Sequence, residues 1–272
     1  MSIAAYTQSF TVATYNIRYN IPENYKYDST RGEDWQRRGP AIAKLIRYHE
    51  FEIFGTQEGM LHQLKDIESW VPGYTYVGVG RDDGEKEGEH AAIFYSTSRF
   101  KVMDKGDFWL SETPDKPSKG WDATCCNRLC SWALFEDLTS DKQFFVFNAH
   151  FDHQGIEARK ESSKLILKRI SEIAGEKPVI FMGDLNGDHE SEWYLTVEKS
   201  HPFNDTFLLA NDPYVQNGSF NGFGRRTGSK SIIDHVFVSQ HFKVLKWGII
   251  TDTYHGKFPS DHFPIAVNVD FK

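Results

Sequence analysis

Short apolar segments bounded by turn residues recur along this 272-residue chain, and they constrain its fold more than any other feature. Segments of this kind are typical of β-strands, whereas helical periodicity is confined to 35–49, 61–70 and 156–175. The pattern favours an α/β fold in which two packed mixed β-sheets are flanked by helices, rather than a regular parallel β-α-β winding. The predicted strands are 10–17, 53–56, 74–79, 91–95, 100–110, 131–136, 144–149, 179–182, 233–238, 243–251 and 265–269.

No repeat, low-complexity tract or proline- and serine-rich linker divides the chain, so we expect one domain over 1–272. With 39% hydrophobic residues it can bury a sizeable core. It has no apolar run of the ~18 residues that a membrane helix needs. Residues 1–10 lack the basic start and long apolar core of a signal peptide. We therefore expect a soluble protein, cytoplasmic or exported after removal of a signal not present in this chain.

The charge balance and the cysteines narrow the function classes. A formal charge of -7 disfavours nonspecific duplex binding, although divalent cations at a site can offset it in a nuclease. A small phosphorylated substrate suits this balance better. Cys125, Cys126 and Cys130 form no C-x-x-C pair, which argues against a zinc site. We interpret them as free thiols on a core strand, with no disulfide framework.

The stretch 178–188, P-V-I-F-M-G-D-L-N-G-D, carries the clearest chemical signal. Val179 to Met182 predict a buried strand, and a glycine turn then delivers Asp184 and Asn186. Because strand residues two apart face the same side, these two side chains can converge on one water molecule beside a metal-bound phosphate. Taken alone, G-D-x-N is also a common turn.

Further polar residues stand where other predicted strands end, which is the expected layout for a site on a rigid scaffold. Each has a plainer explanation on its own, as a turn, cap or core residue. Their coincidence at several strand ends is harder to dismiss. These residues are Asn16, Glu58, His150, Asp152, Asp234, Asp261 and His262.

The ordered set N…QE…H…GDLN…D…SDH resembles the endonuclease/exonuclease/phosphatase superfamily over 14–264, nearly the whole chain. Within it the chain looks most like a bacterial branch that carries W-x-x-R (Trp35, Arg38), the segment 108–114 and H-F-D-H. The resemblance implies a four-layer α/β sandwich. It also implies Mg²⁺-dependent hydrolysis of a phosphate ester, with Mn²⁺ as a possible substitute.

The resemblance assigns one group of residues to the metal and the nucleophile. Glu58 is the principal metal ligand, and Asn16 and Asp261 complete the metal region; hard oxygen donors of this kind suit Mg²⁺. Asp184 orients and deprotonates the attacking water, and Asn186 fixes that water or a phosphate oxygen.

A second group concerns the histidines. Asp234 is expected to orient His262, which then stabilises the charged transition state. In the alternative, His262 is the general base and Asp184 an orienting group. His150 donates to a phosphate oxygen or to the leaving group, with Glu89 as its candidate partner.

Substrate binding is assigned to Arg128, Asp152 and Asn221. Arg128 departs from the family pattern, because asparagine stands before it where a proline is expected. His153 and His235 neighbour site residues and are expected to point away, since adjacent strand residues face opposite sides. The segments 82–89 and 111–124 are predicted to be long loops at the rim of the cleft.

Three functions stay open. The first is a phosphatase or phosphodiesterase for a small or exposed phosphorylated substrate. The second is a nuclease for DNA or RNA, supported by the cluster Phe220, Phe223, Arg225 and Arg226. The third is a non-catalytic binding module, against which the intact set of site residues argues. No protein partner is evident from the sequence.

Overall fold

The computed structural model describes residues 9–272, so most of the N-terminal segment considered for targeting lies outside the described residues. The described chain forms two six-stranded sheets. The first has the order β11 (Phe242–Ile249), β12 (Ile265–Phe271), β1 (Phe10–Asn16), β2 (Ile53–Gln57), β4 (Ile93–Ser96) and β3 (Tyr74–Val77). The second has the order β5 (Phe100–Trp109), β6 (Leu129–Asp137), β7 (Lys142–His150), β8 (Val179–Asp184), β10 (Asp234–Ser239) and β9 (Phe203–Asp205).

Both sheets are mixed in the same way. Neighbouring strands are antiparallel except for β1 with β2 in the first sheet and β7 with β8 in the second, and each parallel pair lies at the centre of its sheet. A parallel pair needs a crossover connection. The first crossover contains η1 (Pro22–Asn24), α1 (Tyr25–Arg31) and α2 (Trp35–Tyr48), and the second contains α4 (Ile156–Ala174).

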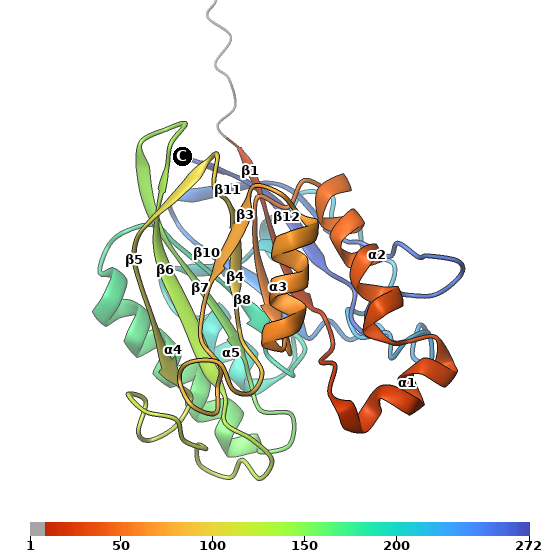
Figure 1. Cartoon of the computed structure of the whole chain (residues 1–272). Coiled ribbons are helices and arrows are strands. Elements are labelled where there is room, and N and C mark those ends of the chain that lie inside the picture. Colours follow the sequence, from red (N-terminus) through yellow and green to blue (C-terminus); the bar gives the residue numbers. More distant parts are fainter. Residues whose placement is uncertain (1–8) are drawn as a thin grey trace, which may run out of the picture.

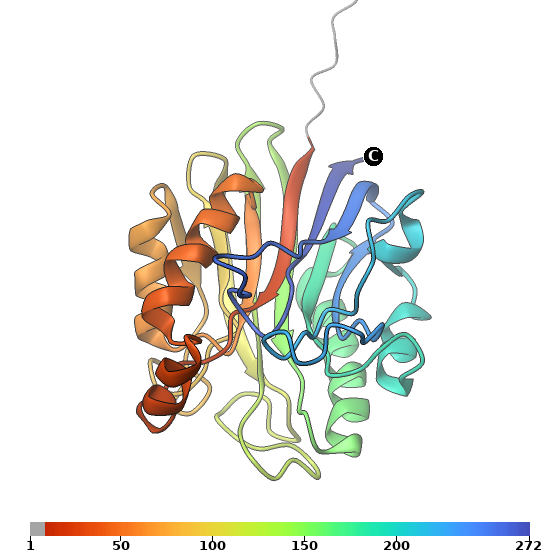
Figure 2. The ribbon, with the colours of Figure 1, turned by 90° about the vertical axis from the view of Figure 1, so that its right-hand side faces the viewer.

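The sheets pack face to face with helices outside them. On β1, Phe10 and Val12 enter the core between the sheets, while Ala13 and Tyr15 pack towards α2 and α3 (Leu61–Trp70). Helices α4 and α5 (Glu192–Glu198) cover the outer face of the second sheet, as Figures 1 and 2 show. This alternation is the period-2 pattern of strands buried on both faces. The predicted four-layer α/β sandwich is confirmed.

Every strand and helix expected from the sequence is present, with small shifts at the ends. The short elements β9, α1, α5 and α6 (Thr206–Leu209) were not predicted. They span at most seven residues each, too few for a periodic pattern to stand out. Gly183 was expected in a turn but belongs to β8.

The cysteine prediction was wrong in part. Cys125 and Cys126 form a disulfide between neighbouring residues, and they lie in the loop before β6 rather than on a core strand. Only Cys130 is a buried free thiol on β6, as expected. The error arose because β6 begins at Leu129, so the strand does not reach back to the first two cysteines.

No helix in the part of the chain that the structure describes is long and apolar enough to cross a membrane.

Candidate active site

The second sheet sets three chemically active side chains in a row. In the register of the central strands, His150 on β7 pairs with Asp184 on β8, and Asp184 pairs with Asp234 on β10. All three residues stand at the ends of their strands. Gly183 permits this close packing, because a Cβ there would lie 2.1 Å from the carbonyl oxygen of Ala149. The row therefore follows from strand pairing alone.

The first sheet supplies the opposite wall. Asn16 ends β1, and Glu58 follows β2 with a left-handed φ of 63°. The Ser260 hydroxyl donates to the carbonyl oxygen of Asn16 at 2.6 Å, which fastens the loop carrying Asp261 and His262 to this strand end. A cleft of about 690 Å³ lies between the two walls.

Asp184 is the centre of the site and is almost fully buried. Its Oδ1 accepts from the backbone N–H of Asn186 at 2.9 Å, and its Oδ2 accepts from Asn16 at 3.1 Å. The same Oδ2 lies 3.6 Å from His150 Nε2 and 3.8 Å from His262 Nε2. Burial and the neighbouring Asp234 raise the pKa of Asp184 to about 7. A carboxylate in this state is suited to accept a proton near neutral pH.

Asn186 lies beyond the end of β8, in a left-handed conformation with φ 47°. It reaches the cleft beside Asp184 through this turn and not through strand alternation. Its Nδ2 donates to the carbonyl oxygen of Phe151 at 3.0 Å. Its Oδ1 is thereby turned to the other side, where it can accept a hydrogen bond.

His262 is held by Asp234, as the sequence predicts. His262 Nδ1 lies 2.9 Å from Asp234 Oδ2, and both side chains are buried. Burial by itself lowers the pKa of His262, but Asp234 and the neighbouring carboxylates Asp184 and Asp261 raise it to about 10. His262 therefore carries a positive charge beside Asp184 at neutral pH.

His150 has the opposite character. Arg128 Nη1 donates to His150 Nδ1 at 2.8 Å, and because a guanidinium can only donate, the proton of the neutral ring sits on Nε2. Burial and the positive charge of Arg128 hold the pKa of His150 well below its usual range. His150 is therefore a neutral hydrogen-bond donor. Glu89, its candidate partner, lies 3.9 Å from Nδ1 and pairs instead with Arg81 at 2.5 Å.

The two histidines expected to point away behave differently. His235 is buried on the helix side of β10, as predicted. His153 lines the cleft, which contradicts the prediction. Its Nδ1 accepts from Arg128 Nη2 at 2.9 Å. It follows the end of β7, so the alternation of a strand no longer applies to it.

On the metal side, Glu58 and Asp261 face the cleft. Asn16 Nδ2 donates to Glu58 Oε1 at 3.0 Å, and Asn16 Oδ1 accepts from the backbone of Arg18. Asn16 therefore orients Glu58 here, and it is not among the residues that line the cleft. Burial raises the pKa of Glu58, but Arg18 and His262 lower it below its usual value.

Arg18 was not singled out in the sequence. Its guanidinium lies 3.4 Å from Glu58 Oε2 and 3.8 Å from Asp261 Oδ2, between the two carboxylates. Burial of the Asp261 carboxyl and the negative charge of the nearby Glu58 raise the pKa of Asp261 above its usual value. The two carboxylates are hard oxygen donors that suit a divalent cation such as Mg²⁺, and Arg18 places positive charge between them here. No sequence motif marks Arg18, because its role depends on residues far along the chain.

Two residues assigned to substrate binding do not line the cleft. Asn221 is fully buried and donates to the carbonyl oxygen of Ser260 at 3.2 Å, so it supports the loop of Asp261. Asp152 Oδ1 accepts from two backbone N–H groups, and its Oδ2 lies 3.9 Å from Arg128 Nε. Arg128 itself lines the cleft, but both of its terminal nitrogens donate hydrogen bonds to histidines.

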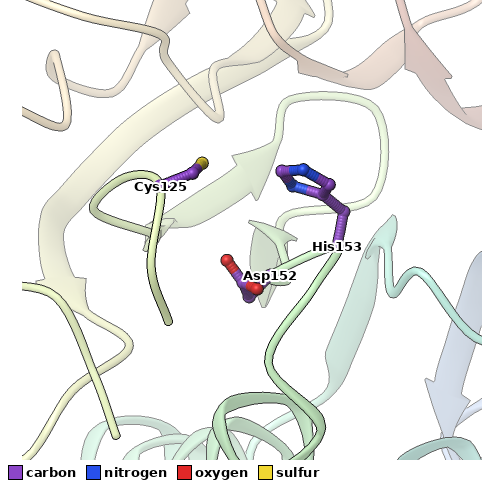
Figure 3. Close-up of side chains that lie close together, drawn as sticks. All are labelled: Cys125, Asp152 and His153. Atoms are coloured by element: carbon purple, nitrogen blue, oxygen red, sulfur yellow. The ribbon is translucent and has the colours of Figure 1, made fainter. Parts of the chain in front are cut away.

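Figure 3 shows Cys125, Asp152 and His153, which lie close together near Arg128. They do not suit a cation, because the cysteine is in a disulfide and Arg128 donates to the histidine.

Of the two loops predicted to lie at the rim, only one lines the cleft. Asp82, Gly88 and Glu89 line the cleft, as predicted for the loop 82–89. The segment 111–124 does not line it; its Asp122 accepts from the backbone of Ala158 at 2.7 Å and caps α4. The disulfide that follows this segment lines the cleft instead. The sequence did not indicate the lining residues Tyr19, Ile21, Met60, Arg81, Asp82 and Ile233 individually as site residues.

Comparison with known proteins agrees with this geometry. The model of the endonuclease/exonuclease/phosphatase family matches residues 13–262. The chain belongs to this family. Residues 13–262 thus form a phosphoesterase domain, and members of this family are phosphoric ester hydrolases.

Two solved structures from Bacteroides thetaiotaomicron are similar over nearly their whole length. One is a protein of the same family, with 45% identity, a TM-score of 0.93 and coverage of 98% of this chain and 99% of the other. The second is a mannosyl-6-phosphatase, with 45% identity, a TM-score of 0.92 and coverage of 96% and 100%. An uncharacterized protein of Acanthamoeba polyphaga mimivirus is 23% identical over 78% of this chain, which spans only 35% of that protein.

Proposed function

We propose that this protein is a divalent-metal-dependent phosphatase that hydrolyses the monoester of a phosphorylated sugar by direct attack of water. The observation that carries this proposal is the opposition of two walls across one cleft. The wall of the second sheet holds Asp184 and the neutral His150. The wall of the first sheet holds Glu58, Asp261 and the charged His262, which reaches across to Asp184 and Asp234. We also propose that the two sheets form a single domain, since strands of both share one core.

In this proposal Asp184 is the general base. Its raised pKa lets it accept the proton of an attacking water, and Asn186 Oδ1 holds that water in place. The positive charge of His262, held by Asp234, stabilises the phosphoryl oxygens in the transition state. The alternative, with His262 as the base, has less support, because a protonated imidazole has no lone pair to accept a proton.

His150 has a different part. A neutral imidazole is a weak acid, so its Nε2–H is suited to donate a hydrogen bond to a phosphate oxygen rather than to protonate the leaving group. Arg128 positions it by occupying Nδ1. The same arginine lines the cleft and adds positive charge behind the phosphate.

Glu58 and Asp261 would hold the cation, with Asn16 orienting Glu58. A bound divalent cation would supply charge neutralisation at the phosphate oxygens. Arg18 would then give up its place between the two carboxylates, and its positive charge would be free to face the substrate in the cleft.

The substrate class rests on the cleft and on a relative. A volume of about 690 Å³ suits a small ligand, and the relative with 45% identity is a mannosyl-6-phosphatase. The cluster that favoured a nuclease is used within the protein: Arg225 pairs with Glu33 at 2.7 Å, and Arg38 lies 5.4 Å from the Phe223 ring. Phe220 still lines the cleft and Arg226 is exposed, so the choice of a sugar phosphate over a nucleic acid rests on the cleft volume and on the relative.

A substrate panel tests the proposal. With Mg²⁺, phosphate release is measured from mannose 6-phosphate, other hexose phosphates, nucleotides and inositol phosphates, and cleavage is followed on plasmid DNA and oligo-RNA. We expect turnover of a sugar phosphate at a kcat/KM at least ~10² times that on any nucleic acid, and none in chelator. The Asp184→Asn variant serves as the control for contaminating phosphatase. Preferential cleavage of DNA or RNA would overturn the substrate class, and full activity in chelator would overturn the metal dependence.

A further inference from the structure

A second cluster of metal-binding side chains lies on the outer face of the second sheet. His189 follows the G-D-L-N segment, Asp205 ends β9, and His235 is on β10. One ligand atom from each residue lies within 4.8 Å of the other two. His235 neighbours Asp234 in the chain, but its ring is on the opposite side of the sheet from the cleft. The catalytic proposal makes no use of this cluster.

The distances within the cluster do not suit direct hydrogen bonds. Asp205 Oδ2 lies 3.4 Å from His189 Nε2 and 3.6 Å from His235 Nδ1, beyond the usual 2.7–3.2 Å of an N–H···O bond. His189 Nε2 is buried and has no hydrogen-bond partner. Ligands about 2.0–2.2 Å from a tetrahedral zinc ion are about 3.3–3.5 Å apart. The two separations from Asp205 Oδ2 are close to that spacing.

The ring orientation of His235 makes its Nδ1 available to a cation. His235 Nε2 lies 2.8 Å from the carbonyl oxygen of Gly187, and since a carbonyl only accepts, Nε2 carries the proton. The neutral ring then directs the lone pair of Nδ1 towards the carboxylate of Asp205. Two electron-rich atoms facing each other in a buried place require a proton or a metal ion between them. An imidazole that donates its other N–H to a carbonyl is the usual arrangement of a metal ligand.

Neighbouring residues hold the Asp205 carboxylate and the His189 ring in place. Asp205 Oδ1 accepts from the backbone of Phe207 at 2.9 Å, and Tyr194 donates to Oδ2 at 2.8 Å, which leaves a lone pair of Oδ2 for a cation. The His189 ring stacks on Phe207, with centroids 5.0 Å apart. The side chain of His189 is 29% exposed although its Nε2 is buried, so the cluster lies close to the surface.

We propose that His189, Asp205 and His235 form a structural cation site for Zn²⁺ or a similar transition metal, separate from the catalytic cleft. Two imidazole nitrogens and one carboxylate oxygen select such an ion over Mg²⁺, which takes oxygen ligands. These three ligands would leave the fourth position of a tetrahedral ion to a water molecule. The bound ion would tie 187–189, which directly follows Asn186, to β9 and β10. This proposal does not depend on the catalytic one.

Zinc uptake by the whole protein tests this site. The protein is stripped with chelator, and ZnCl₂ is titrated by calorimetry with Mg²⁺ in excess. His189→Ala should take up one zinc fewer than wild type, or bind that ion at least about tenfold more weakly. The zinc-induced rise in melting temperature should shrink with it. His189→Cys should restore binding, because a thiolate is also a zinc ligand.

His49→Ala is the matched control, because His49 also faces a carboxylate, Asp252, at 2.8 Å but is in no three-ligand cluster of the described chain. It should bind zinc as wild type does. If His189→Ala does not fold, His189→Gln, which keeps the side-chain volume, replaces it. Equal zinc stoichiometry and affinity in wild type, His189→Ala or Gln, and His49→Ala would overturn the proposal and leave a hydrogen-bonded network.

Discussion

The two sheets have the same pattern of pairing but contribute different chemistry to the cleft. Each has a single parallel pair at its centre, and each presents site residues at the carboxyl end of that pair. In the second sheet, His150 and Asp184 stand in register within the strands. In the first sheet, Asn16 ends β1 and Glu58 lies beyond β2 with a left-handed backbone.

The difference shows how one topology supports two tasks. Strand register holds the acid–base groups rigidly, because each is flanked by paired neighbours. The carboxylates of the other wall lie in turns, and Arg18 occupies the space between them. We therefore expect substitutions in the second sheet to change the chemical step, and substitutions in the first to change cation binding.

Asp184→Asn should have the largest effect. We expect kcat to fall at least ~10³-fold, because a general base and its charge are both lost. Cation affinity measured by calorimetry should change far less. The melting temperature should stay the same or rise, since a buried carboxylate with a raised pKa is removed. A variant that unfolds would instead support a purely structural role for the G-D-L-N turn.

Glu58→Gln should weaken cation binding more than it changes the chemical step. The loss of a charged oxygen ligand should weaken Mg²⁺ or Mn²⁺ binding at least ~10²-fold, and high metal concentrations should restore part of the activity. Calorimetric titration and metal-dependent rates measure this. Glu85→Gln, which removes an exposed acid of the rim loop, is the control and should bind metal normally. Unchanged metal affinity in Glu58→Gln would show that Glu58 is not a ligand of the cation.

The pair Asp234 and His262 tests coupling between β10 and the loop that carries His262. Asp234→Asn and His262→Ala should each lower kcat by about 10²-fold, since each removes the oriented positive charge. The double variant should be little worse than His262→Ala, because the two residues act as one unit. Rates of the four proteins complete the cycle. Additive losses would show that the 2.9 Å contact has no part in catalysis.

Arg18→Gln should have the smallest effect, and it acts on cation binding. Removing a competing guanidinium should tighten Mg²⁺ binding about two- to fivefold, the scale of a partly exposed ion pair. Calorimetry measures this directly. Arg37→Gln is the control, because Arg37 on α2 pairs with Asp34, the N-cap residue of that helix. Weaker cation binding in Arg18→Gln would mean that Arg18 supports the carboxylates and does not compete for them.

Much of the architecture could be predicted because strands and helices have local, periodic patterns. On β1, Phe10 and Val12 face the core between the sheets, and Ala13 and Tyr15 face the core under the helices. This alternation is visible in the sequence. Polar residues at strand ends stand out for the same reason, so the predicted site residues Asp184, His262, Glu58 and Asp261 lie together in the cleft. Short elements such as β9 carry no such pattern.

The sequence by itself determined which of the longer strands form and which side chains stand at their ends, because both follow from neighbours in the chain. The tertiary structure decided the rest. It decided that Asn221 and Asp152 support loops, that His153 turns into the cleft, and that Arg128 sets the tautomer of His150. These outcomes depend on contacts between distant segments, such as the bond from Ser260 to Asn16 across 244 positions. No local pattern encodes such contacts, because they exist only once the two sheets have packed.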